Sequence, residues 1–182
     1  LVKMISINES DFKMRRAIIR VDFNVPMDSQ KNVLDNSRIK AAKSTILKVI
    51  NDGGSVILMS HLGRPKGKDL NLSLRHIIPE LEKILNHKVL FAEDSMGPAT
   101  QAISKNLKSG EILLLENLRF YPEETNGDED FAKQLSSYAD CYINDAFGTA
   151  HRAHASTTVI AKFFKNNKFS GHLLYKEVEA IK

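Results

Sequence analysis

Short apolar runs alternate along the chain with longer segments whose apolar residues recur at helical spacing. The runs lie at residues 17–21, 56–59, 89–91, 112–115 and 141–143. Each is short and rich in β-branched or leucine side chains, which favours a buried strand over a helix. Strands and helices that alternate in this way predict one α/β domain, with a doubly wound parallel sheet, helices on both faces and right-handed crossovers. Beyond residue 143 the pattern is less clear.

Four helices are predicted between these strands. The first has an apolar face from Ile39 to Ile50, with Asn36 or Ser37 as N-cap and Gly53-Gly54 as the stop. The second has a face from residue 77 to 85 that contains a proline at position 79, which predicts a kink or a later helix start.

The third and fourth helices follow the next two strands. The third is predicted to bury Ala99, Ala102, Ile103 and Leu107, with a proline at position 98 in its first turn. An acidic loop at residues 123–128 leads into the fourth helix, whose face is Phe131, Leu135 and Tyr138. The carboxylates of this loop are interpreted as complementing the helix macrodipole.

Polar side chains follow directly after several of the predicted strands. Arg64, Arg119 and Arg152 each come after a different strand, His61 and His151 stand beside two of them, and Arg38 opens the first helix. The carboxyl ends of parallel strands share one edge of a sheet, where open α/β folds bind ligands. A single arginine would most simply be a solvated surface residue. Several arginines in matching positions after strands predict a site for a small anion, because each guanidinium can bind two oxygens.

Asp22 and Asn24 end the first predicted strand, and two interpretations of them stay open. They can bond a substrate hydroxyl among the arginines, or they can form an Asx turn that closes the strand. His151 and His154 are one helical turn apart, but zinc is not favoured because no third ligand of comparable clarity is near them.

Several common sites are missing from the sequence. The segment from Gly63 to Lys68 lacks the spacing of a Walker A loop, no G-x-G-x-x-G follows a strand, and there is no G-x-S-x-G elbow. The sequence therefore indicates an anion site without a nucleotide site or a metal site.

Composition narrows the remaining classes. The 182 residues, 42% hydrophobic and 26% charged, suit one domain of ordinary globular type. A pI near 9.1 and a net charge of +4 would be compatible with nucleic-acid binding. The sequence contains no run of five or more basic residues, however, so nucleic-acid binding is disfavoured. The lone Cys141 is expected to be a buried core residue in a reducing compartment. With no signal-peptide pattern and no membrane-spanning run, the expected location is cytoplasmic, without membrane contact.

Four segments resemble, in the same order, motifs in the N-terminal half of phosphoglycerate kinase. They are Arg20 to Pro26, Ser60 to Pro65, Leu115 to Phe120 and Ile143 to Thr157, and the resemblance is close. The resemblance covers essentially the whole chain and implies a Rossmann-like domain that holds 3-phosphoglycerate or 1,3-bisphosphoglycerate. It implies that Asp22 and Asn24 contact the glycerate end and that Arg38 acts on the phosphoryl group in transfer. By the same resemblance the phosphate would be bound by His61, Arg64, Arg119 and Arg152.

The resemblance also implies how the chain is organised. Residues 1–172 would form the phosphoglycerate-binding domain, and residues 173–182 would begin an interdomain helix, with the nucleotide-binding half absent. Mg-ATP or Mg-ADP would be the nucleotide of the whole enzyme and would not bind this chain tightly. This chain alone is expected to be inactive. The apolar stripe of Leu174, Val178 and Ile181 predicts weak self-association through that helix. The alternative is a non-catalytic module that binds phosphorylated metabolites.

Overall fold

The computed structural model describes residues 4–146, 153–172 and 180. Seven parallel strands form one sheet in the order β1-β7-β6-β2-β3-β5-β4. Their bounds are β1 Ile5–Ser6, β2 Arg16–Arg20, β3 Ser55–Met59, β4 Val89–Ala92, β5 Ile112–Leu115, β6 Cys141–Asn144 and β7 Lys168–Ser170. All five predicted strands are confirmed. The two additional strands, β1 and β7, pair with each other at one edge of the sheet.

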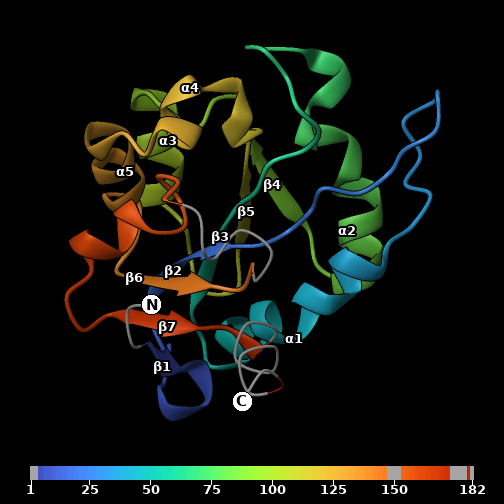
Figure 1. Cartoon of the computed structure of the whole chain (residues 1–182). Helices are drawn as coiled ribbons and strands as arrows, with labels where there is room; N and C mark the ends of the chain where they lie inside the picture. The colour runs from blue at the N-terminus through green and yellow to red at the C-terminus, as the bar shows by residue number, and fades with distance from the viewer. Residues whose placement is uncertain (1–3, 147–152, 173–179, 181–182) are drawn as a thin grey trace.

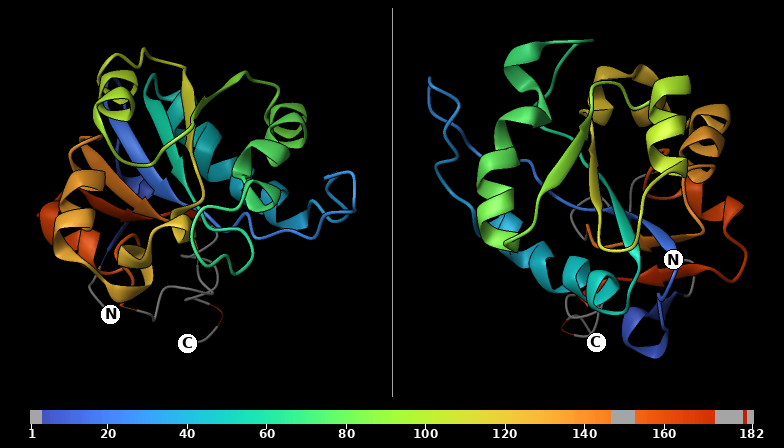
Figure 2. Two further views of the ribbon diagram at one scale, coloured as in Figure 1. Left: turned by 90° about the horizontal axis from the view of Figure 1, so that it is seen from above. Right: turned by 180° about the vertical axis from the view of Figure 1, so that it is seen from behind.

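Helices cover both faces of this sheet, as predicted (Figure 1). The α-helices are α1 Ser37–Asn51, α2 Ile78–Leu85, α3 Pro98–Lys105, α4 Pro122–Asn126 and α5 Glu129–Ser136. The 3₁₀ turns are η1 Ile7–Glu9, η2 Leu70–Leu72, η3 Leu74–Ile77, η4 Leu118–Phe120 and η6 Val159–Phe163. In Figure 2, α1 and α2 lie on one side of the sheet, and α3 and α5 lie on the other.

Alternate residues of the strands supply the two halves of the core. In β2, Ile19 packs in the cluster on the α1 and α2 side, whereas Ile18 packs in the cluster on the α5 and η6 side. The same division separates Leu58 from Ile57 in β3. Successive side chains of a strand point to opposite faces, so a continuous apolar run buries both faces of the sheet. This burial explains why the strands contain no polar alternation.

The helix starts follow the predicted signals, with two refinements. α1 begins after Asn36, which occupies the N-cap position but makes no capping hydrogen bond with its side chain. Pro79 lies in the first turn of α2, and the residues before it form the separate turn η3, so the later start is confirmed. Pro79 lacks an N–H that a helix interior would need, and in the first turn this costs nothing.

The predicted buried face of α3 is wrong for three of its four residues, and only Leu107, beyond the end of the helix, is partly buried against the core. Ala99, Ala102 and Ile103 are exposed, and the helix buries Thr100 and Ser104 instead. Their hydroxyl groups are satisfied locally, since Thr100 Oγ1 donates to the Asp94 carbonyl and Ser104 Oγ to the Gln101 carbonyl. A small polar side chain that bonds the backbone can be buried at low cost, which the hydrophobic pattern does not register.

The acidic segment before α5 is more ordered than the predicted loop. Residues 122–126 form α4, and Asp128 is the N-cap of α5, where its side chain accepts a hydrogen bond from Phe131 N. Glu129 and Asp130 occupy the first turn of α5, in accord with the macrodipole interpretation. Glu123 and Glu124 likewise occupy the first turn of α4, but Glu124 is also fully buried and accepts a hydrogen bond from Ser156 N.

Among the described residues, no helix is both long enough and apolar enough to cross a membrane. Cys141 is fully buried, as expected, and burial raises the pKa of its thiol to about 12.

Candidate functional site

The candidate site lies at the carboxyl edge of the sheet, where the winding changes direction. From β2 the chain crosses through α1 to β3 on one side, and it later returns through α5 to β6 on the other side. Because β2 pairs with both β3 and β6, the switch point falls at the end of β2. Open α/β sheets bind ligands at such a point. Asp22, Asn24 and His61 follow directly on these strands.

Asp22 and Asn24 form a compact polar turn after β2. Asp22 Oδ1 accepts the backbone N–H of Asn24 at 3.0 Å, which is the Asx turn considered from the sequence. Asn24 Oδ1 accepts Gly63 N at 2.9 Å, so the turn also fixes the loop after β3. The two interpretations are therefore compatible, because the hydrogen bonds of the turn use only Asp22 Oδ1 and Asn24 Oδ1 and leave the second Asp22 oxygen and the Asn24 amide nitrogen for a ligand.

Arg38 reaches this turn from the first turn of α1. Its Nη1 donates to the Asn24 carbonyl oxygen at 2.7 Å and lies 3.3 Å from Asp22 Oδ1. The guanidinium is about half exposed, so an anion can approach it. The ion pair with Asp22 orients the side chain while solvent screening keeps the attraction weak.

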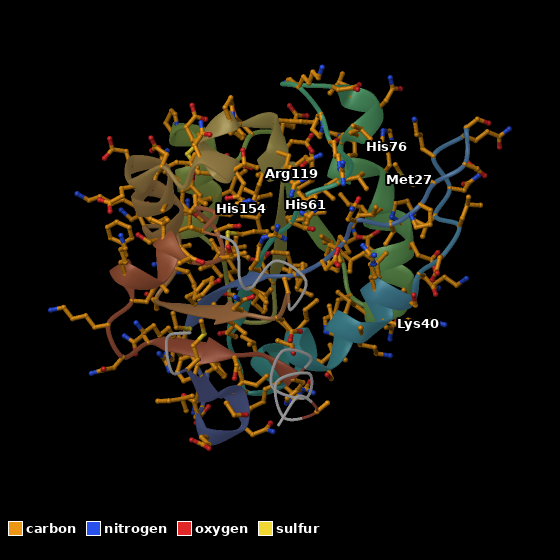
Figure 3. All side chains as sticks on the ribbon, viewed as in Figure 1. Met27, Lys40, His61, His76, Arg119 and His154 are labelled. Atoms are coloured by element: carbon orange, nitrogen blue, oxygen red, sulfur yellow. The ribbon has the colours of Figure 1, made fainter. Side chains whose placement is uncertain are left out.

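His61 is the buried centre of the site. It is 6% exposed, and its Nδ1 lies 3.0 Å from Arg20 Nη2. Burial, together with the neighbouring groups Arg20, Arg119, His154 and Arg38, lowers the pKa of His61 to about 3, and burial is the largest cause. His61 is thus a neutral imidazole at physiological pH. Figure 3 shows His61, Arg119 and His154 close together, in agreement with these electrostatic interactions.

Arg119 is placed by the turn η4, which follows β5. Asn117, fully buried, organises this turn with four hydrogen bonds. Its Oδ1 accepts from Leu62 N and Arg119 N, and its Nδ2 donates to the carbonyl oxygens of Leu62 and Leu72. The loops after β3 and β5 are therefore joined through one amide side chain.

The structure does not bring every predicted residue into this cluster. Arg64 follows Gly63 in the loop after β3, but its side chain is exposed and forms no ion pair with any described residue. Arg152 and His151 lie outside the described residues. The structure adds His154, which is 8% exposed and near enough to His61 to lower its pKa. The sequence signal for His154 is its spacing of one helical turn from His151, which by itself suggests only a metal-ligand pair.

Three further residues were missed as part of this region: Glu124, Ser156 and Asn117. No spacing rule identifies them, because Glu124 and Ser156 are brought together by contacts between distant parts of the chain. In the described part of the chain, no three His, Cys, Asp or Glu residues are grouped so as to hold a metal ion.

Fold and site together define a class of protein: a doubly wound α/β domain with arginine and histidine side chains gathered at the switch point. Comparison with known sequences makes the assignment specific, since the family model for phosphoglycerate kinase matches residues 7–182. The chain belongs to the phosphoglycerate kinase family.

Individual relatives agree. A phosphoglycerate kinase of Porphyromonas gingivalis is 44% identical over 97% of this chain, and one of Anaeromyxobacter dehalogenans is 50% identical over 97%. The solved phosphoglycerate kinase structure from Pyrococcus horikoshii superposes with a TM-score of 0.88 at 33% identity, over 98% of this chain and 45% of that one. The two curated relatives are covered over 48% and 45% of their length, so the chain spans about half of each.

Proposed function

We propose that this chain is the 3-phosphoglycerate-binding half of an enzyme that transfers a phosphoryl group reversibly between 1,3-bisphosphoglycerate and ADP. The observation that carries the proposal is the convergence of Asp22, Arg38, His61 and Arg119 at the switch point, in a chain of this family. Phosphoryl transfer needs chiefly positioning and charge stabilisation, which such a cluster supplies without a protein nucleophile.

The turn after β2 would hold the glycerate end of the substrate. The oxygen of Asp22 that does not accept Asn24 N can accept a substrate hydroxyl, and the Asn24 amide nitrogen can donate to the carboxylate. Arg38, half exposed beside them, would neutralise charge on the phosphoryl group as it moves.

The substrate phosphate would be bound by Arg119 and His61 together with Arg64 and Arg152. His61 would contribute a neutral N–H donor, because its depressed pKa keeps it uncharged. Arg64 is exposed, so its side chain can turn toward an anion held by the other groups.

The remaining parts of the proposal concern what accompanies this half. In a protein as long as the relatives, the Mg-ATP or Mg-ADP site would come from the portion that this chain does not span, after an interdomain helix that begins at residue 173. We expect this chain alone to bind nucleotide weakly. Self-association through residues 173–182 stays a prediction, since residues 173–179 and 181–182 lie outside the described ones.

We also propose a cytoplasmic location. The single buried cysteine suits a reducing compartment. Two of the similar relatives are named as cytosolic phosphoglycerate kinases, of Arabidopsis thaliana and Nicotiana tabacum, whereas another of Arabidopsis thaliana is named as chloroplastic.

Calorimetric titration of the 182-residue chain with 3-phosphoglycerate, ATP and a short RNA tests the proposal. We expect saturable binding of 3-phosphoglycerate alone, weakened about tenfold or more by Arg119→Met because one charge-assisted contact is lost. Arg75→Met, which removes an exposed arginine paired with Glu93, is the matched control and should leave binding unchanged.

Three results would contradict the proposal. They are an absence of 3-phosphoglycerate binding, binding of RNA at least as tight as that of 3-phosphoglycerate, and binding that Arg119→Met leaves intact. Turnover of ATP and 3-phosphoglycerate by this chain alone would contradict the expectation that a second half is needed.

A further inference from the structure

Arg20 is a buried arginine at the end of β2, and each of its three side-chain nitrogens makes a hydrogen bond inside the protein. Its side chain is 1% exposed. Its Nε donates to Ser156 Oγ at 2.8 Å, its Nη1 donates to the Val21 carbonyl, and its Nη2 bonds His61 Nδ1 at 3.0 Å. Unlike Arg38, it therefore cannot turn outward to a ligand.

Glu124 and Ser156 complete a neutral network around Arg20. Glu124, fully buried, lies 4.0 Å from Arg20 Nη2. It accepts Ser156 N at 2.9 Å and Ser156 Oγ at 2.5 Å, while the same hydroxyl accepts Arg20 Nε. Tyr142 in β6 donates its hydroxyl to the Ser156 carbonyl at 2.8 Å. The charge of Arg20 is thus balanced internally, and every member of the network is fixed by another.

The hydrogen bond from Arg20 determines the protonation of His61. A guanidinium has donors only, so His61 Nδ1 must act as the acceptor and cannot carry a proton. A neutral imidazole with Nδ1 unprotonated carries its proton on Nε2. A proton on both nitrogens would place an N–H against Arg20 Nη2.

The surrounding charges act in the same direction. His61 is faced by Arg20 from β2, Arg38 from α1, Arg119 from η4 and His154 from the segment before η6. Glu124 of α4 lies behind Arg20 and is paired with it. No anion among these groups faces His61 directly, so a positive imidazole would be repelled on each side.

We propose that Arg20, held by Ser156 and Glu124, is a positioning residue that locks His61 as a neutral imidazole with its proton on Nε2. His61 then offers the bound anion a directed, uncharged donor whose state is constant between pH 5 and 8. The use of this donor rests on the proposed function, whereas the locked tautomer can be measured without any ligand.

The tautomer is tested by long-range ¹H–¹⁵N NMR of the histidine side chains, with His61 assigned by its loss in His61→Gln. In the wild-type chain we expect Nδ1 unprotonated and Nε2 protonated, without titration from pH 8 to 5. In the double variant Arg20→Met with Glu124→Gln, His61 should show both tautomers and titrate with a pKa raised by about two units or more, into the range between pH 5 and 8. The glutamine can still bond Ser156 N and Oγ, and loss of both charges together avoids a lone buried ion.

Binding provides the second measurement. At pH 7.5 the double variant should bind 3-phosphoglycerate about tenfold more weakly, as expected for one misdirected hydrogen bond. Its affinity should then increase on acidification to pH 5.5, as His61 gains charge. Arg75→Met with Glu93→Gln removes an exposed arginine–glutamate pair and should change neither measurement.

If the double variant does not fold, Ser156→Ala is the alternative variant, because it keeps the charges of Arg20 and Glu124. It removes the hydroxyl that Arg20 Nε contacts and should broaden the tautomer population of His61. The proposal is overturned if wild-type His61 carries its proton on Nδ1 or is charged at pH 7, or if a folded variant keeps the wild-type tautomer and pKa. If 3-phosphoglycerate fails to bind the wild type while the tautomer behaves as expected, the proposed function fails and the positioning role of Arg20 stands.

Discussion

At the scale of single residues, the site combines cations that solvent can reach with one histidine that solvent barely reaches. Arg38 is half exposed, whereas His61 is buried and bonded to Arg20. Burial and neighbouring cations lower the pKa of His61 to about 3, against 6.5 in an unfolded chain. This difference links the protonation of one side chain to the stability of the fold.

The first prediction is the sign of that linkage. As the pH falls from 7 to 5, the unfolded chain gains a proton on residue 61 and the folded chain does not, so the unfolded state is favoured. Over this range the titration of residue 61 in the unfolded chain should lower the free energy of unfolding by about 2 kcal/mol. Urea unfolding of the wild type and His61→Gln at pH 7 and pH 5 measures it. The wild type should lose more stability than the variant, and equal losses would refute a neutral His61.

The second prediction separates Arg38 from Arg64 in an enzyme that carries both halves. If Arg38 acts mainly on the migrating phosphoryl group, Arg38→Ala removes a transition-state interaction and lowers kcat on the order of 100-fold. Arg64→Ala should raise the KM for 3-phosphoglycerate about tenfold and change kcat little. Steady-state kinetics of both variants decides, and the reverse pattern would show that the two roles are exchanged.

At the scale of elements, the sequence predicts what depends on apolar periodicity and fails where polar side chains are buried. All five predicted strands are present because continuous apolar runs signal strands covered on both faces. The edge strand β1 has two residues, too few for any pattern. In α3 the apolar residues are exposed, and two hydroxyl-bearing residues that bond the backbone are buried instead.

This reversal in α3 gives a third prediction. Ile103→Ser should lower the free energy of unfolding by about 1 kcal/mol, because the residue is 36% exposed and only partly buried. Ile46→Ala in α1, where the side chain is fully buried, should cost about 2–5 kcal/mol. Denaturant unfolding of both variants is the measurement. A cost for Ile103→Ser close to that of Ile46→Ala would show that α3 is turned the other way.

The candidate site shows the same division. Asp22, Asn24, Arg38, His61 and Arg119 could be expected near one another from their positions after strands. The network of Arg20, Ser156 and Glu124 could not, since it depends on contacts across 32 and 136 positions of sequence. Local spacing carries no information about such contacts. Arg20 was visible in a motif, but only its burial distinguishes a positioning residue from a ligand-binding one.

At the scale of the whole molecule, the account depends on which edge of the sheet binds the ligand. The cations of the candidate site lie at the carboxyl edge, after β2, β3 and β5. At the opposite, amino edge the structure has a cavity of about 420 Å³, lined by Arg16, Gln101, Ser104, Lys105, Ser137 and Tyr138. Two of these residues, Arg16 and Lys105, are cationic, so this cavity is an alternative anion site to the one at the carboxyl edge.

Titration of the ¹⁵N-labelled chain with 3-phosphoglycerate, followed through its backbone amide signals, distinguishes the two edges most directly. The account predicts saturable shifts at the carboxyl edge, at the amides of Asn24, Gly63, Arg119 and His154. Signals of Arg16 and Lys105 should stay in place. Saturable shifts that cluster around Arg16 and Lys105, with the carboxyl-edge amides unmoved, would contradict it.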